Sequence, residues 1–161
     1  MKRKLFTNAA AFVLLTAGAV GSGHALGDTE NCNNKLLNGR YGFTIQGTKF
    51  AVPNVTGPTG PQVGVAMADV YGDGTFEQID TVTINGEVVA DFTHPKANGT
   101  YTVNPDCTGT FTIDFTDMRP PVVTSFVVVE NGLEIDTVVT SAGGKQGILA
   151  LGSVGKKVSF W

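Results

Sequence analysis

Ionisable side chains are sparse in this sequence. Only 16% of the 161 residues are charged, and the chain has just two histidines and two cysteines. Glycine, in contrast, is plentiful at 21 residues, which suits a turn-rich β protein better than a disordered chain. The formal net charge is −3. A mildly acidic protein does not offer the basic surface that nucleic acids attract, so we expect no nucleic-acid partner.

The signatures of the common enzyme classes are also missing. The sequence contains no GxSxG elbow, no HExxH zinc motif, no phosphate-binding loop and no GxGxxG fingerprint. The two cysteines are far apart and lack CxxC spacing, which argues against a metal site. We therefore expect neither a metal nor a cofactor, and the sequence leaves open whether the protein is an enzyme.

Long apolar runs are absent except at the N-terminus. There, a basic start (residues 1–4) precedes a mostly apolar stretch, and Gly23 and Ala25 place small side chains before a cleavage point. This pattern predicts a signal peptide over residues 1–25. The alternative, a membrane anchor, is less favoured because the apolar stretch is interrupted and falls short of the ~20 residues that a span needs. We expect one exported domain, residues 26–161, in the periplasm or outside the cell, with no membrane span after processing.

Processing would change both the charge and the redox setting of the chain. Removal of three positive charges and no negative ones takes the net charge from −3 to about −6. Both cysteines, Cys32 and Cys107, lie in the expected mature part. An even number of cysteines in an oxidising compartment predicts a disulfide between them. Closing a loop of this length would stabilise the fold by roughly 3–4.5 kcal/mol.

Short β-rich runs separated by turn residues fill the chain from Arg40 onward, with no helical periodicity. The pairs Asp73-Gly74, Asn85-Gly86 and Asn131-Gly132 predict hairpins, because type I′ turns need positive φ at both central residues. Eight or nine sequential strands form an antiparallel up-and-down meander, which closes most economically into a barrel. A β-sandwich is the alternative. The expected strands are 40–48, 62–71, 75–84, 87–93, 99–104, 109–116, 122–130, 133–141 and 146–152.

Three segments carry a family resemblance. Residues 37–43 read LNGRYGF and resemble the LNGxYxF opening strand of a group of small exported bacterial all-β proteins. Residues 99–110 resemble that group's GTYTVNxDxxGT hairpin, and residues 68–74 are similar to its aDGxG turn with two residues inserted. More loosely, the chain resembles calycin-like barrels of the allene oxide cyclase kind. The resemblance implies export and a barrel fold; no catalytic motif of those enzymes can be placed here.

Three aspartates come into register if the Asp-Gly and Asn-Gly turns each hold two residues. Asp69, Asp80 and Asp91 would then share one face of three adjacent strands, and Asp80 would face Asp91 directly. Inside a barrel, such a cluster would be a candidate acid/base site; outside, it would be a solvated acidic stripe. We favour the stripe, because the opposite face reads better as a core. That face carries Ala66, Ala68, Val70, Ile79, Ala90 and Phe92.

Candidate ligand-binding residues surround this cluster. Met67, Phe76 and Gln78 fall on or beside the same expected face, since Met67 would pair with Asp80. Arg119, next to two prolines in a loop, is a candidate contact for an anionic group at a barrel mouth.

Three functional hypotheses follow. The leading one is an exported barrel of binding or structural role, with a small apolar ligand in its lumen. The main alternative is a cyclase- or isomerase-type enzyme that uses carboxylates of the lumen to move protons. The third is self-association through residues 122–130, because this strand is apolar on both faces and its outer face needs a cover. That cover would be another subunit or the tail that ends at Phe160 and Trp161.

Overall fold

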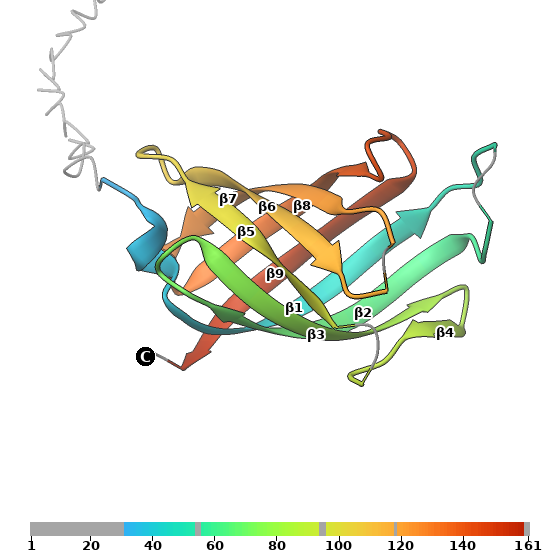
Figure 1. Ribbon diagram of the computed structural model, residues 1–161, viewed down its shortest axis with the longest axis horizontal. Helices are drawn as coiled ribbons and strands as arrows, with labels where there is room; N and C mark the ends of the chain where they lie inside the picture. Colours follow the sequence, from blue (N-terminus) through green and yellow to red (C-terminus); the bar gives the residue numbers. More distant parts are fainter. Residues whose placement is uncertain (1–30, 54–55, 94–95, 118, 160–161) are drawn as a thin grey trace, which may run out of the picture.

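Antiparallel strands make up most of the described part of the computed structural model (Figure 1). It describes residues 31–53, 56–93, 96–117 and 119–159, so the expected signal peptide lies outside the described residues. Within these ranges it contains nine strands and two short 3-10 helices. They are η1 (Asn34–Leu37), β1 (Gly39–Lys49), β2 (Gly60–Val70), β3 (Thr75–Ile84), β4 (Glu87–Ala90), β5 (Ala97–Val103), β6 (Thr108–Phe115), β7 (Val122–Val129), η2 (Glu130–Gly132), β8 (Glu134–Ala142) and β9 (Leu149–Ser159).

The sheet closes on itself. Its strand order is β2-β1-β9-β8-β7-β6-β5-β3, and β2 also pairs with β3, so eight strands form a complete antiparallel barrel. The short strand β4 is bonded to β3 outside this ring. Closure leaves no long unpaired edge. The structure therefore confirms the predicted barrel, and the sandwich alternative is wrong.

The largest error in the expected strands concerns the last one. The expected strand 146–152 is instead β9, Leu149–Ser159, which lies between β8 and β1 and closes the barrel. The C-terminal segment is thus part of the barrel wall and does not cover β7. Residues 160–161, which were expected to form that cover, lie outside the described residues.

The hairpin turns match the sequence signals to different degrees. Asn85 and Gly86 have φ of 52° and 84°, as the predicted type I′ turn requires. The predicted Asn131-Gly132 turn is wrong in type, because Val129 pairs with Glu134 around a four-residue loop. The predicted two-residue Asp73-Gly74 turn is also wrong, since the loop has three residues.

Two hairpins at one end of the barrel share this three-residue design. In the β2–β3 loop, Gly74 has a φ of 97°, and the Asp73 carboxylate accepts hydrogen bonds from the amide and hydroxyl of Thr75. The β5–β6 loop repeats the arrangement: Asp106 accepts the same two bonds from Thr108. Cys107 takes the position of the glycine there, with a φ of 66°. Both loops are type I turns followed by a left-handed residue.

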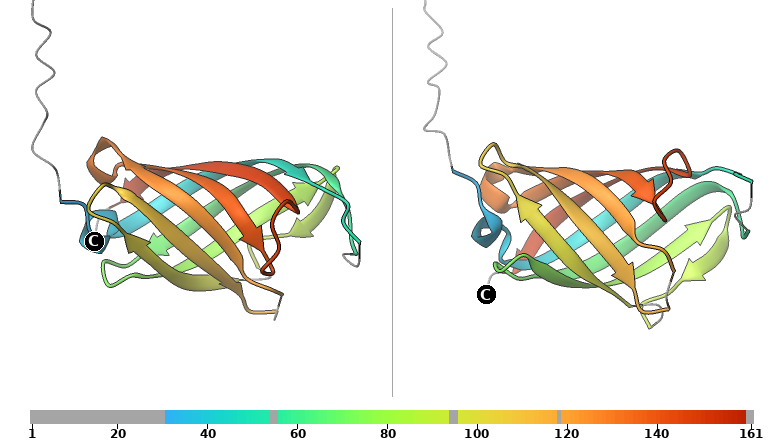
Figure 2. Two further views of the ribbon diagram at one scale, coloured as in Figure 1. Left: turned by 90° about the horizontal axis from the view of Figure 1, so that it is seen from above. Right: turned by 45° about the horizontal axis from the view of Figure 1, so that its top comes forward.

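The two hairpins lie at the same end of the barrel as η1, and we call it the closed end (Figure 2). Helix η1 lies across it, with Leu37 fully buried, and the Cys32–Cys107 disulfide ties the segment before η1 to the β5–β6 turn. This confirms the predicted disulfide. Aromatic rings fill the barrel behind η1, several of them against glycines where an added Cβ would clash. The pairs are Phe76 with Gly99, Phe126 with Gly109 and Phe43 with Gly155.

Candidate functional site

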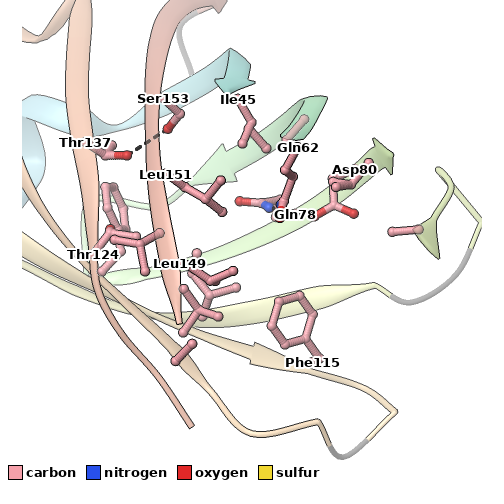
Figure 3. Close-up of a pocket in the computed structure, with 18 of the residues that line it drawn as sticks. Ile45, Gln62, Gln78, Asp80, Phe115, Thr124, Thr137, Leu149, Leu151 and Ser153 are labelled. Carbon is pink, nitrogen blue, oxygen red and sulfur yellow. Dashed lines mark hydrogen bonds between the residues drawn. The ribbon is translucent and has the colours of Figure 1, made fainter. Parts of the chain in front are cut away.

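The other end of the barrel, which we call the open end, contains a cavity of about 710 Å³ (Figure 3). Every barrel strand but β5 contributes to its lining. On β2 the inward side chains at this level are Ala66 and Ala68, which are too small to fill the lumen. The wall is mostly apolar and includes Phe43, Ile45, Phe115, Leu149 and Leu151.

Three buried polar atoms of the cavity wall have no hydrogen-bond partner in the described part of the chain. They are Oε1 of Gln62, Oδ1 of Asp80 and Oγ1 of Thr124, on side chains that are only 8%, 7% and 5% exposed. Such an atom typically costs ~1–3 kcal/mol when it loses water without gaining a partner. All three residues line the cavity, from strands β2, β3 and β7. They mark positions where a bound molecule would gain hydrogen bonds that the protein alone does not make.

Asp80 is the acidic group of the cavity, and no other Asp or Glu among the described residues lines it. Its Oδ2 accepts a hydrogen bond from Nε2 of Gln78 at 3.2 Å, whereas Oδ1 is buried without a partner among the described residues. Burial raises the pKa of Asp80, because the apolar wall disfavours the ionised form; the bond from Gln78 and the charge of Arg119 oppose this rise. Asp80 is thus an acid with a shifted pKa inside an apolar cavity.

Other polar groups of the wall are satisfied within the protein. The hydroxyls of Thr137 on β8 and Ser153 on β9 are 2.7 Å apart and hydrogen-bonded to each other. Figure 3 shows this pair on one side of the cavity and Gln78 with Asp80 on another. The cavity wall therefore has two kinds of polar group. The hydroxyls of Thr137 and Ser153 are hydrogen-bonded to each other, whereas the three buried oxygen atoms have no partner among the described residues.

Basic side chains line the mouth of the cavity. Arg119 lies over the ring of Phe115, with its Cζ 4.4 Å from the ring centroid, and its Nε is 2.8 Å from Oδ2 of Asp117. Lys49, the last residue of β1, and Lys145, in the β8–β9 loop, also belong to the lining. Arg119 thus lies at the mouth, where the sequence predicted it, and it is already engaged by an ion pair and a ring.

The expected cluster of three aspartates does not form. Asp69 is on the outer face of β2 and makes a two-pronged ion pair with Arg40, whose Nε and Nη2 lie 2.6 and 2.8 Å from the two carboxylate oxygens. Asp91 follows β4 on the surface and accepts a bond from the Thr93 amide. Asp80 alone reaches the lumen, so the expected solvated stripe is wrong for Asp80.

The cause is the register of two hairpins. The extra residue in the β2–β3 loop pairs Asp69 with Glu77 and Met67 with Ile79, one position away from the expected register. A one-residue slip moves every side chain of one strand to the other face. On the next hairpin the register shifts between Val82 and Thr83, and β4 ends before it reaches Asp91.

Of the other expected site residues, some line the cavity and one lies on the outer face of the barrel. Phe76, Gln78 and Arg119 line the cavity, whereas Met67 lies on the outer side of β2. Of the expected core face, Ala66, Ala68, Val70 and Ala90 are buried, but Ile79 points outward and Phe92 is 49% exposed. The sequence reasoning missed Gln62 and Thr124. Gln62 could have been found, because it continues the inward alternation that ends in Ala66, Ala68 and Val70.

The expected self-association would involve the outer face of β7. Val127 of β7 is exposed on the outside of the barrel, and self-association through residues 122–130 stays a prediction. In the part of the chain that the structure describes, no helix has the length and hydrophobicity to cross a membrane.

Comparison with known proteins assigns no family. The sequence matches no protein-family model, and no curated protein is significantly similar to it. The function must therefore be argued from the cavity itself.

Proposed function

We propose that this protein is an exported barrel that binds one small, mostly apolar molecule in its lumen. The observation that carries the proposal is the cavity of about 710 Å³ at the open end. Its size lies within the range of ~300–1,000 Å³ that is typical of pockets for small ligands, and its wall is predominantly apolar with a few polar groups. The closed end is packed, so a ligand would enter from the open end.

The energetics of such a site are favourable. Burial of roughly 400 Å² of apolar ligand surface contributes about 10 kcal/mol at ~25 cal/mol per Å². Association costs of ~4 kcal/mol or more offset part of this gain. What remains, about 6 kcal/mol or less, corresponds to dissociation constants of tens of micromolar or weaker.

Export is part of the proposal and rests on two observations. The N-terminal residues 1–25 have the pattern of a cleavable signal peptide. The disulfide between Cys32 and Cys107 is of the kind that persists in oxidising compartments. A protein that holds an apolar molecule in the periplasm or outside the cell would keep that molecule soluble there.

A second candidate function is supported by Asp80. A buried carboxyl with a raised pKa, inside an apolar lumen, is the kind of group that moves a proton in a cyclase or isomerase. Asp69 and Asp91 would not contribute, because they lie outside the lumen. We favour binding, since Asp80 has no second acidic group of the described chain beside it to complete an acid/base pair.

The first experiment asks whether the lumen is occupied. The full-length chain is exported to the periplasm of a bacterial host, purified without denaturation, and examined by native mass spectrometry before and after reduction. We expect the mass of residues 26–161 with an intact disulfide, and a retained or added apolar molecule at one per chain. Displacement of the fluorescent probe N-phenyl-1-naphthylamine then measures affinity.

A pair of neighbouring substitutions places the binding site. Ala66→Trp fills the lumen, because Ala66 is buried and lines the cavity. Val65→Trp makes the same kind of change at the next residue, which is 48% exposed on the outer wall. We expect at least a tenfold loss of probe binding in A66W and no loss in V65W, with the same circular dichroism for both. Equal binding by the two variants would contradict a lumen site.

A further inference from the structure

We propose that the ligand carries a hydrogen-bond donor, most simply a hydroxyl group, that binds Oδ1 of Asp80 inside the cavity. The inference rests on the proposed binding function and names the chemistry of the ligand's polar group. It concerns an otherwise apolar molecule, such as a long-chain or ring-shaped alcohol, and it excludes a ligand that places a carboxylate at this position.

The first step is the state of Asp80. Its side chain is 7% exposed, it points into the cavity, and one of its two oxygens is engaged by Gln78. The other oxygen has no partner among the described residues. An unpartnered carboxyl oxygen in an apolar wall is costly, and a donor from a ligand removes that cost. The polar group of the ligand would therefore lie next to Asp80 on β3.

The second step is the character of the remaining unpartnered atoms. Oε1 of Gln62 is an acceptor, and Oγ1 of Thr124 is a hydroxyl that accepts as well as donates. Together with Asp80 they present acceptor oxygens from three strands of the barrel. A ligand that is complementary to this wall carries hydrogen-bond donors. A hydroxyl also accepts a bond, so it suits Asp80 in both its ionised and its neutral form.

The third step concerns what the site would reject. A carboxylate brings only acceptors, and beside an ionised Asp80 it brings a like charge as well. The cations Lys49, Lys145 and Arg119 line the same cavity, but they belong to its mouth, and Arg119 is already paired with Asp117. These residues would meet a charged group only at the rim. The buried part of the cavity therefore selects a neutral, donor-bearing molecule.

The test compares four probes with the same saturated chain: decanol, decyl methyl ether, decylamine and decanoate. The ether keeps the oxygen and loses the donor, so it isolates the predicted bond. Displacement of N-phenyl-1-naphthylamine at neutral pH gives the four affinities. We expect decanol to bind about tenfold more tightly than the ether, as a buried hydrogen bond predicts, and decanoate to bind more weakly than decanol.

Variants assign the preference to Asp80. Asp80→Leu should reduce decanol to the level of the ether, because the acceptor is gone. Asp80→Asn keeps an acceptor oxygen without the charge, so it should retain the alcohol preference and bind decanoate better than the wild type does. Asp114→Asn, the same change at an exposed position on the outer side of β6, is the matched control and should leave all four affinities unchanged.

The outcomes separate the two proposals. If neither the fluorescent probe nor any alkyl probe binds, the binding function itself is wrong. If the probes bind but decanol and its ether are equal, or decanoate is the tightest, the binding function stands and the inference about Asp80 is overturned. If D80L does not fold, D80N still tests the inference. If folded D80N binds decanoate as weakly as the wild type does, the proposed role of the Asp80 charge is contradicted.

Discussion

The two ends of this barrel use the same strands for opposite purposes. At the closed end, inward positions alternate between glycines and aromatic rings that fill them, as in Gly109 with Phe126. At the open end, small inward side chains such as Ala66 and Ala68 border a cavity of about 710 Å³. A regular alternation thus produces a core at one end and a cavity at the other. The small inward side chains of β2 contribute to this difference.

Polar groups show the same contrast. At the closed end the Tyr41 hydroxyl donates to the carbonyl oxygen of Gly132 at 2.6 Å, and the Tyr101 hydroxyl donates to that of Asn34 at 2.8 Å. Burial raises the pKa of both tyrosines, so they stay neutral donors. At the open end, Asp80 and Thr124 keep buried oxygens without partners in the described residues. Satisfied groups stabilise the fold, whereas unsatisfied groups are available to a ligand.

The largest expected effect on stability comes from removing the disulfide at the closed end. The double substitution Cys32→Ala/Cys107→Ala removes the crosslink over a sequence separation of 75 residues. We expect the free energy of unfolding to fall by about 3–4.5 kcal/mol, measured by urea denaturation. Ligand binding should be unchanged at temperatures where the variant is folded. A loss of binding in the folded variant would show that the two ends are coupled.

A smaller effect of opposite sign is expected at the open end. Thr124→Val replaces a buried hydroxyl, which has no partner among the described residues, with a methyl group of the same shape. We expect the free energy of unfolding to rise by about 1 kcal/mol, while the preference for decanol over its ether falls. Thermal denaturation and probe displacement measure the two quantities. A destabilised T124V would mean that the hydroxyl is satisfied in solution.

The smallest expected effect is a difference in pH dependence. The raised pKa of Asp80 means that the folded state holds its proton to higher pH than the unfolded state does. The stability linked to this proton is complete below about pH 4 and is lost as the pH rises through the folded pKa. At the closed end, hydrogen bonds lower the pKa of Asp73 and Asp106, so their contribution is lost as the pH falls.

Asp80→Asn isolates the open-end part of this dependence. We expect the stability difference between D80N and the wild type to grow in favour of D80N from about pH 4 toward neutrality. Urea denaturation at several pH values measures it, with D114N as the control for a change of net charge. A difference that is constant with pH would contradict a raised pKa at Asp80.

Most of the fold was predictable because its signals are local. Alternating apolar residues and explicit turn residues indicate where each strand begins and ends, and the type I′ turn at Asn85-Gly86 followed from two residues. Closure followed from the number of strands and their short connections. The extent of β9 was harder to predict, because its sequence is rich in glycine and lysine and shows little alternation.

The site was less predictable, because it depends on register. An Asp-Gly pair fits a two-residue turn and also the end of a three-residue loop, and the bonds from Thr75 to Asp73 favour the second. That one-residue difference moves Asp80 from the expected surface stripe into the lumen. The cavity volume was beyond prediction, since it depends on how side chains from seven strands of the barrel fill a shared space.

Cys107 occupies a position that suits glycine. Its backbone has a φ of 66°, and the matching position of the β2–β3 loop is Gly74. A side chain in this conformation costs roughly 1–2 kcal/mol, and the crosslink to Cys32 more than compensates for it. In a reducing environment the cost would remain without the compensation, and glycine would be the better residue. The turn is thus better suited to oxidising than to reducing conditions, and the chain would be less stable under reducing conditions.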